Sequence, residues 1–345
     1  WTGSVVMPRT MDGCIGLSTQ DSMRLYVDDK LLIDGWGKDK SADQALDFHF
    51  EAGRTYKIRI EFVNDRRGAR VIFGYSAGRE NFPAAVEAAR KADVAILCMG
   101  DNEETSGENF DRTDLNLPGR QLELVQAVYA TGTPVVLVLQ SGRPVTANWE
   151  NDHLPAILEA WFPGEQGGTA IAKTLFGDAA PGGRLPITFP RSVGQIPCHY
   201  SRRPGGGKRY VEMDWLPLYP FGYGLTYTTF AYRDMALSRS VIDPQDTVTV
   251  SVTVTNTGKY TGDAVPQLYV RDMFSSVVKP ERQLAAFRRL TLAPGESRRV
   301  ELTVGPKQLR TLGPDYVWRV EPGKFELQLG DNAENILLRA DLTVE

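Results

Sequence analysis

The chain has 345 residues, of which 42% are hydrophobic and 24% charged, with a formal net charge of −4. These values are typical of a globular protein with two or three domains. The negative charge argues against a nucleic-acid partner, and no apolar run approaches the roughly 18 residues that span a bilayer. Three widely separated cysteines predict neither a disulfide framework nor a metal site, and no cofactor is expected.

Residues 1–76 have the pattern of antiparallel β structure. Apolar runs at Met23–Val27 and Lys30–Ile33 flank Asp28 and Asp29, a dipeptide that favours a hairpin turn. Thr55–Val63 alternates between apolar and polar residues, as a half-buried strand does. The segment is therefore predicted to be a partial β-sandwich.

Residues 77–222 alternate between helical and strand patterns. A helix is expected over residues 81–92, followed by the continuous apolar run Val94–Met99, which predicts a strand buried on both faces with Cys98 as a small buried hydrophobe. This alternation predicts a mostly parallel α/β sandwich. Further helices are expected at residues 119–130 and 167–176, and further strands at residues 134–139 and 156–161.

Residues 223–345 return to an all-β pattern. Thr247–Asn256, in which valine alternates with threonine or serine, is the clearest strand of the chain. Similar runs follow at residues 267–271, 298–304 and 324–329, separated by turn residues. We expect a sandwich of the immunoglobulin or fibronectin type III kind. The fold class is thus multidomain, α/β plus all-β.

The loop after Val94–Met99 is the first candidate for chemistry, because ligands of parallel sheets bind beyond the carboxyl ends of the strands. Residues 100–112 of this loop hold five carboxylates. Cleavage of a glycosidic bond needs a proton donor and a second carboxylate on the other side of the sugar. A solvated acidic loop without function is the alternative interpretation.

The sequence around this loop resembles the acid/base loop of glycoside hydrolase family 3 β-glucosidases. The resemblance is carried by Ser106–Arg112 and Leu115–Gln121, and it covers essentially the whole chain. It implies a retaining β-glycosidase, in the first place a β-glucosidase, whose substrate is a β-glucoside or an oligosaccharide. Further matches follow in order at residues 163–168, 175–178, 181–190 and 218–227.

The two flanking segments resemble further domains of that family. Residues 1–76 are similar to the later part of a protective-antigen-type domain, which some family members carry inserted within their α/β sandwich. The C-terminal residues 223–345 are similar to the family's terminal fibronectin type III domain.

Carried over residue by residue, the resemblance implies that Glu108 is the general acid/base. Asn109 departs from the family pattern, which has glycine at this position. Asp111 and Arg112 match family positions and are expected to form a structural ion pair with each other. Glu103 and Glu104 are rival acids. Trp161 and Phe162 are candidates for a sugar-stacking wall, with core packing as the alternative.

The resemblance implies that the catalytic nucleophile lies outside this chain. In the family it is an aspartate near the end of a (β/α)8 barrel, upstream of the segments matched here. The Asp214-Trp215 pair sits in a connector and is not expected to replace it. We therefore expect an N-terminal barrel fragment of the same protein as a partner, because residues 94–189 alone would leave a sheet edge and an apolar face uncovered. The sequence also allows a homodimer.

Two other functions remain open from the sequence. One is a carbohydrate-binding fragment without catalysis, which the missing nucleophile favours. The other is a family 3 phosphorylase or N-acetylhexosaminidase, although some of those enzymes draw their acid/base from the barrel. Glucose is the first expectation for the sugar, with xylose, a glycosylated natural product or a longer glucan as alternatives.

Overall fold

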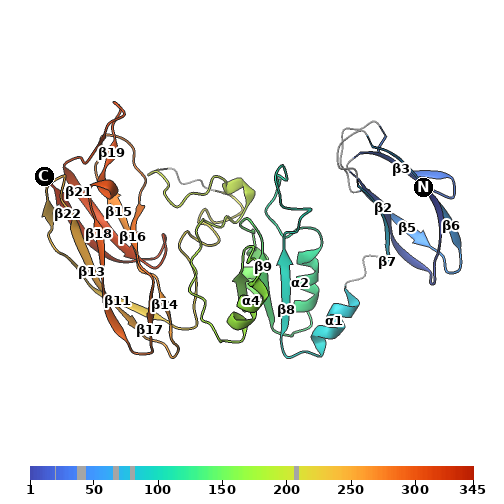
Figure 1. The fold of residues 1–345 in the computed structure, drawn as a ribbon, viewed down its shortest axis with the longest axis horizontal. Helices are drawn as coiled ribbons and strands as arrows, with labels where there is room; N and C mark the ends of the chain where they lie inside the picture. The colour runs from blue at the N-terminus through green and yellow to red at the C-terminus, as the bar shows by residue number, and fades with distance from the viewer. Residues whose placement is uncertain (20, 37–43, 65–69, 78–81, 206–209) are drawn as a thin grey trace. The chain divides into compact units, whose positions relative to one another are not determined.

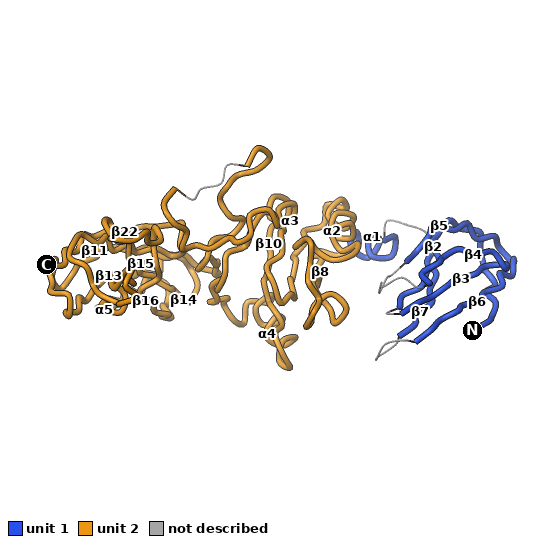
Figure 2. The backbone as a smooth tube through the Cα atoms, turned by 90° about the horizontal axis from the view of Figure 1, so that it is seen from above, with its two compact units in different colours: residues 1–91 blue, residues 92–345 orange. Residues whose placement is uncertain are grey.

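A computed structural model describes most of the chain, which divides into two compact units, residues 1–91 and 92–345 (Figure 2). Each unit is considered by itself. The three domain ranges expected from the sequence stay predictions. The described residues are 1–19, 21–36, 44–64, 70–77, 82–205 and 210–345.

The first unit contains two antiparallel sheets around a shared apolar core (Figure 1). The antiparallel prediction is thereby confirmed, whereas the protective-antigen resemblance stays a prediction. One sheet has the order β1-β6-β3-β4, formed by Thr2–Val6, Thr55–Val63, Ser22–Val27 and Lys30–Asp34. The other has the order β5-β2-β7, formed by Gln44–Phe50, Met11–Thr19 and Val71–Ala77.

The predicted hairpin and the predicted alternation both have a clear physical basis in this unit. Asp28 and Asp29 have φ of 50° and 62°, the left-handed pair that a two-residue hairpin requires. On β6, Tyr56, Ile58 and Ile60 point into the core while their neighbours are more exposed. Helix α1, Pro83–Arg90, follows β7; its predicted first residue, Asn81, lies outside the described residues.

The second unit begins with a three-stranded parallel sheet of order β10-β9-β8, as the alternating pattern predicted. The short helix α3 was not expected, since six residues give too little periodicity to recognise. The strands are β8, Ala95–Gly100, β9, Val135–Gln140, and β10, Ala156–Glu159. The helices are α2, Gln121–Tyr129, α3, Asn148–His153, and α4, Gly167–Leu175.

Strand β9 is the buried centre of this sheet, and β8 and β10 are its edge strands. Leu137 and Leu139 of β9 are almost completely buried. In contrast, Ile96 of β8 is 43% exposed and Cys98 is exposed, so the prediction that this strand is buried on both faces is wrong. Ile96 and Cys98 share one face of the strand, because alternate side chains of a strand point the same way, so this face has no covering layer within the described part of the chain. There β8 also pairs only with β9, so its other edge is open.

An irregular connector, described over residues 177–205 and 210–222, leads to the C-terminal β-sandwich, whose sheets have the orders β11-β13-β18 and β12-β22-β21-β15-β16. Their side chains form one apolar core. The predicted all-β segment is therefore confirmed. The first sheet comprises Phe230–Leu237, Val248–Asn256 and Ser297–Val304, and the second Val241–Ile242, Ile336–Val344, Gly323–Gly330, Gln267–Asp272 and Gln283–Phe287. Smaller elements are η1, Val193–Gln195, β14, Gly262–Ala264, β17, Leu290–Leu292, α5, Pro306–Leu309, β19, Thr311–Leu312, and β20, Trp318–Arg319.

A buried side chain ties the connector to this sandwich. The Nε2 atom of Gln267 donates to the backbone oxygens of Gly222, at 2.9 Å, and Asp331, at 2.6 Å. Its Oε1 atom accepts from the hydroxyl of Tyr269 at 2.6 Å. Gly222 has φ of 80° and lies so close to Gln267 that a Cβ atom could not be accommodated. This contact gives a physical reason for glycine within the segment 218–227.

Candidate active site

The loops that follow the three parallel strands leave the sheet at one edge. Gly100 of β8 is paired with Gln140 of β9, and Leu139 of β9 with Glu159 of β10. The segments beginning at residues 101, 141 and 160 therefore meet at the carboxyl edge, where parallel sheets bind their ligands.

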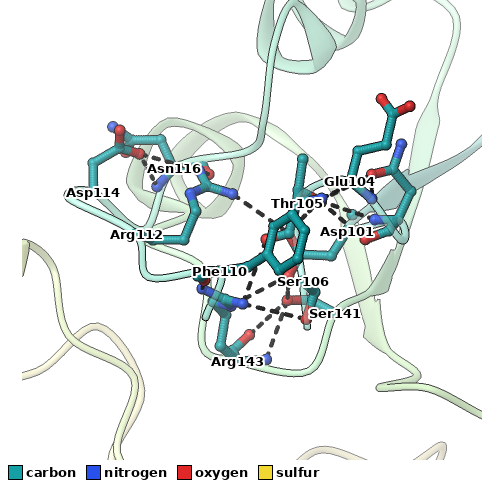
Figure 3. A network of polar contacts seen from close by, with 12 residues as sticks. Asp101, Glu104, Thr105, Ser106, Phe110, Arg112, Asp114, Asn116, Ser141 and Arg143 are labelled. Atoms are coloured by element: carbon teal, nitrogen blue, oxygen red, sulfur yellow. Dashed lines mark hydrogen bonds and ion pairs between the residues drawn. The ribbon is translucent and has the colours of Figure 1, made fainter. Parts of the chain in front are cut away.

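Asp101 anchors the acidic loop to this edge (Figure 3). Its side chain is only 3% exposed. It accepts hydrogen bonds from the hydroxyls of Ser141, at 2.8 Å, and Thr105, at 3.0 Å. The guanidinium groups of Arg112 and Arg143 approach the same carboxylate at 3.4 and 3.5 Å. A buried carboxylate with two hydroxyl donors and two cationic partners is a strong local anchor, and it is not a free acid.

Gln121, the last residue of the segment 115–121, anchors the tip of β8. Its side-chain amide accepts from the Gly100 nitrogen at 2.7 Å and donates to the Gly100 oxygen at 2.8 Å. Gly100 itself has φ of +140° and leaves no room for a Cβ atom against the Gln140 carbonyl. The glutamine therefore satisfies both backbone groups of the residue at which the loop begins.

Glu108 lies at the apex of a tight turn in this loop. The Phe110 nitrogen donates to the Gly107 oxygen at 3.2 Å, which makes Glu108 and Asn109 the two central residues. Asn109 has φ of 66°, as the second central residue of a type II turn must, and asparagine tolerates this conformation after glycine. The turn explains why the family pattern has glycine here. Glu108 is exposed, and within the described residues its carboxylate has no hydrogen-bond or ion-pair partner.

Arg143 joins the two arms of the loop around Glu108 (Figure 3). One terminal nitrogen donates to the backbone oxygen of Thr105 at 3.4 Å and to the hydroxyl of Ser106 at 3.2 Å. The other donates to the backbone oxygen of Phe110 at 3.5 Å. Reasoning from the sequence missed this residue, because an arginine 35 positions downstream gives no local signal of such contacts.

The expected ion pair between Asp111 and Arg112 is wrong. Arg112 instead contacts Asp101 and Asp114, both at 3.4 Å, and donates to the Asn116 oxygen at 3.1 Å. Neighbouring side chains in an extended loop diverge, so Asp101, which the sheet edge presents, becomes the partner.

The rival acids Glu103 and Glu104 lie on the same loop as Glu108, outside its tight turn. Glu103 and Glu104 are both exposed, three or more residues from the turn apex. The crevice beneath the loop, lined by Asp101, Arg112 and Arg143 among others, has a volume of about 10 Å³. That is room for one water molecule at most, so this crevice cannot hold a sugar.

Trp161 and Phe162 lie on the loop after β10 at the same edge. Trp161 is partly buried, has φ of 53° and packs edge-on against Phe189, with ring centres 5.8 Å apart. Phe162 is 56% exposed and its ring lies against Gly142 in the loop after β9. Phe162 therefore remains available for a sugar face, whereas Trp161 is in part a packing residue.

Glu159, which the sequence did not single out, is a half-buried acid at the end of β10. Its Oε1 atom accepts from the Trp161 nitrogen at 2.9 Å, and its Oε2 atom is buried without a hydrogen-bond partner among the residues that the structure describes. Burial raises the pKa of this carboxyl to about 7, against the opposing effect of the Trp161 N–H. Its Oε1 atom is therefore engaged with the start of the loop after β10, and its Oε2 atom is shielded from solvent.

Asp214 and Trp215 lie apart from this edge in the connector. Asp214 is exposed and accepts from the Leu216 nitrogen at 3.0 Å, which makes it a turn residue. Trp215 is covered on one face by the guanidinium of Arg202, 4.4 Å from the ring centre. Within residues 1–345, excluding the stretches that the structure leaves undescribed, no group of three or more His, Cys, Asp or Glu side chains could hold a metal ion.

Comparison with known proteins identifies the family. The glycosyl hydrolase family 3 C-terminal domain matches residues 14–227, and a fibronectin type III-like domain matches residues 264–333. The chain belongs to glycosyl hydrolase family 3. Within this family, a β-xylosidase of Formosa agariphila is 45% identical over 84% of the chain and 42% of its own length. A periplasmic β-glucosidase of Salmonella typhimurium is 42% identical over 73% of the chain and 34% of its own length.

The chain also resembles solved structures of β-glucosidases. A β-glucosidase from Erythrobacter marinus is 41% identical and superposes with a TM-score of 0.74, over 76% of this chain and 36% of that one. A β-glucosidase from Kluyveromyces marxianus is 27% identical, with a TM-score of 0.72 over 100% of this chain and 44% of that one. The chain thus spans less than half the length of these family 3 relatives. No helix in the described residues has the length and apolar character needed to cross a membrane.

Proposed function

We propose that this chain supplies the general acid/base of a retaining β-glycosidase, in the first place a β-glucosidase. The observation that carries the proposal is the Glu108 carboxylate, which has no hydrogen-bond or ion-pair partner among the described residues and lies at a turn apex on the carboxyl edge of the parallel sheet. Such a carboxyl is free to reach a glycosidic oxygen, unlike the buried Asp101 on the same loop. The names of the relatives support the same class of substrate.

In the proposed reaction, a nucleophile from a preceding barrel segment attacks the anomeric carbon while Glu108 donates its proton to the leaving oxygen. The leaving group departs as an alcohol and a covalent glycosyl-enzyme remains. Glu108, now ionised, takes a proton from a water molecule whose oxygen attacks the anomeric carbon. The bond between the sugar and the nucleophile breaks, the nucleophile leaves as a carboxylate, and the sugar is released with its original anomeric configuration. Retention requires the two carboxyl groups to lie about 5–5.5 Å apart.

The open edge of β8 supports the need for a preceding segment. Val94 and Ile96 are 48% and 43% exposed, and the relatives are more than twice as long as the region they share with this chain. The chain alone should therefore not turn over an aryl β-glucoside, and co-production with the barrel segment should give activity. A chain that is monomeric, compact and cooperatively folded when isolated would contradict this part of the proposal. Binding of sugars without turnover even with the barrel segment would favour the carbohydrate-binding alternative.

The acid/base role is tested by Glu108→Ala in the protein that includes the barrel segment. We expect kcat/KM on cellobiose to fall by about 10²–10⁴-fold, while kcat/KM on 2,4-dinitrophenyl β-glucoside, whose leaving group needs no proton, changes little. Azide should restore kcat on the activated substrate by replacing water in the second step. The matched control is Glu103→Gln, also exposed in the loop. Full activity of Glu108→Ala on cellobiose would refute the assignment.

A β-xylosidase is the second candidate, because the Formosa agariphila relative with 45% identity bears that name. The comparison of kcat/KM on p-nitrophenyl β-glucoside and β-xyloside decides between the two. A preference for the xyloside would replace the glucosidase proposal without changing the role of Glu108.

A further inference from the structure

The Glu108 side chain makes no hydrogen bond or ion pair in the described part of the chain, so its position depends on the backbone on either side of it. A general acid must lie within hydrogen-bond distance of the leaving oxygen, and a misplacement of 1 Å can cost about 10²-fold in rate. The groups that fix the loop therefore decide how well Glu108 can act.

Arg143 is the residue that fixes both sides. Its hydrogen bonds reach Thr105 and Ser106, three and two residues before Glu108, and Phe110, two residues after it. Its third nitrogen, Nε, lies 3.5 Å from the Asp101 carboxylate at the base of the loop. One guanidinium thus connects the base and both arms of the turn.

The chemistry of arginine suits this arrangement. The guanidinium is planar and its nitrogens donate in fixed, diverging directions, whereas a lysine ammonium is a compact charge on a flexible stem. The Arg143 side chain is 23% exposed, so its contacts compete with water less than those of a surface arginine do. The side chain also comes from the loop directly after β9, the buried central strand, which provides a rigid base.

We propose that Arg143 is a positioning residue that holds Glu108 at the distance and angle needed for proton donation. The inference rests on the proposed function of Glu108. It predicts that loss of Arg143 slows the step that needs proton donation and leaves the rate of steps that need no proton nearly unchanged.

The test measures kcat/KM on cellobiose and on 2,4-dinitrophenyl β-glucoside for Arg143→Ala, Arg143→Lys and Glu108→Ala, with the barrel segment present. For Arg143→Ala we expect a loss of about 10²-fold on cellobiose and less than about 3-fold on the activated substrate. Arg143→Lys should show the same selectivity, because lysine keeps the charge beside Asp101 and loses the diverging donors. The matched control is Arg239→Ala, which removes a surface arginine paired with Asp246 at 3.0 Å in the C-terminal sandwich.

The outcomes separate the inference from the proposed function. Suppose that Glu108→Ala lowers kcat/KM on cellobiose far more than on the activated substrate, while Arg143→Lys lowers kcat/KM on both substrates equally or on neither. The positioning role is then refuted and the acid/base role stands. If Glu108→Ala itself shows no selectivity, the proposed function fails and the inference fails with it. Should Arg143→Ala not fold, Arg143→Lys and Ser106→Ala, which removes a single contact of the guanidinium, carry the test.

Discussion

Glu159 makes the stability of the second unit depend on pH in an unusual direction. Burial raises the pKa of its carboxyl from 4.5 to about 7, so the folded protein holds the proton more tightly than the unfolded chain does. The contribution of the protonated Glu159 to the free energy of unfolding is fully present below pH 4.5. It is lost as the pH rises through about 7, and above that pH the loss stays constant. The whole loss amounts to about 3 kcal/mol.

Glu159→Gln should remove this dependence, because glutamine keeps an oxygen for the Trp161 N–H and cannot ionise. We expect the free energy of unfolding in urea, taken as variant minus wild type, to be about 2–3 kcal/mol larger at pH 8 than at pH 5. Comparing two pH values cancels any constant cost of burying the new amide. Glu165→Gln, an exposed position in the next loop, is the control. A difference between Glu159→Gln and wild type that is the same at pH 5 and pH 8 would refute the reasoning.

Two further substitutions test local geometry. Asn109→Gly should leave the free energy of unfolding unchanged. Asn109→Val should lower it by about 1–2 kcal/mol in urea unfolding, because a β-branched residue is strained at φ of 66°. Equal stability of the two variants would show that the turn does not need this conformation. Gln267→Leu removes the donor to the backbone oxygens of Gly222 and Asp331 and should lower the free energy of unfolding by about 2–5 kcal/mol. The control for this change is Gln283→Leu at an exposed strand position, and a loss no larger than in the control would contradict the buried tie.

The sequence predicted the class and order of the elements well, because periodicity reports which residues share a buried face. It was wrong about β8, since an apolar run looks the same in the sequence whether or not another layer covers both faces of the strand. Ile96 and Cys98 show the consequence: both are apolar in character and yet exposed on the same face of β8.

The candidate site was only partly predictable. Glu108 could be singled out through the family resemblance, and that role stays a prediction until it is tested. The contacts that hold its loop could not be found in this way, because Arg143 and Ser141 come from another strand end and carry no motif of their own. The buried state of Glu159 likewise depends on how the loops pack, which a local pattern does not encode.

The amide of Gln121 acts as a stop for strand pairing at the tip of β8. It occupies both backbone groups of Gly100, so an additional strand that joined the open edge could pair no further than Met99. The sheet can thus grow sideways without drawing residues 101–112 into its ladder. A single side chain thereby keeps the pairing of β8 separate from the conformation of the loop that follows it.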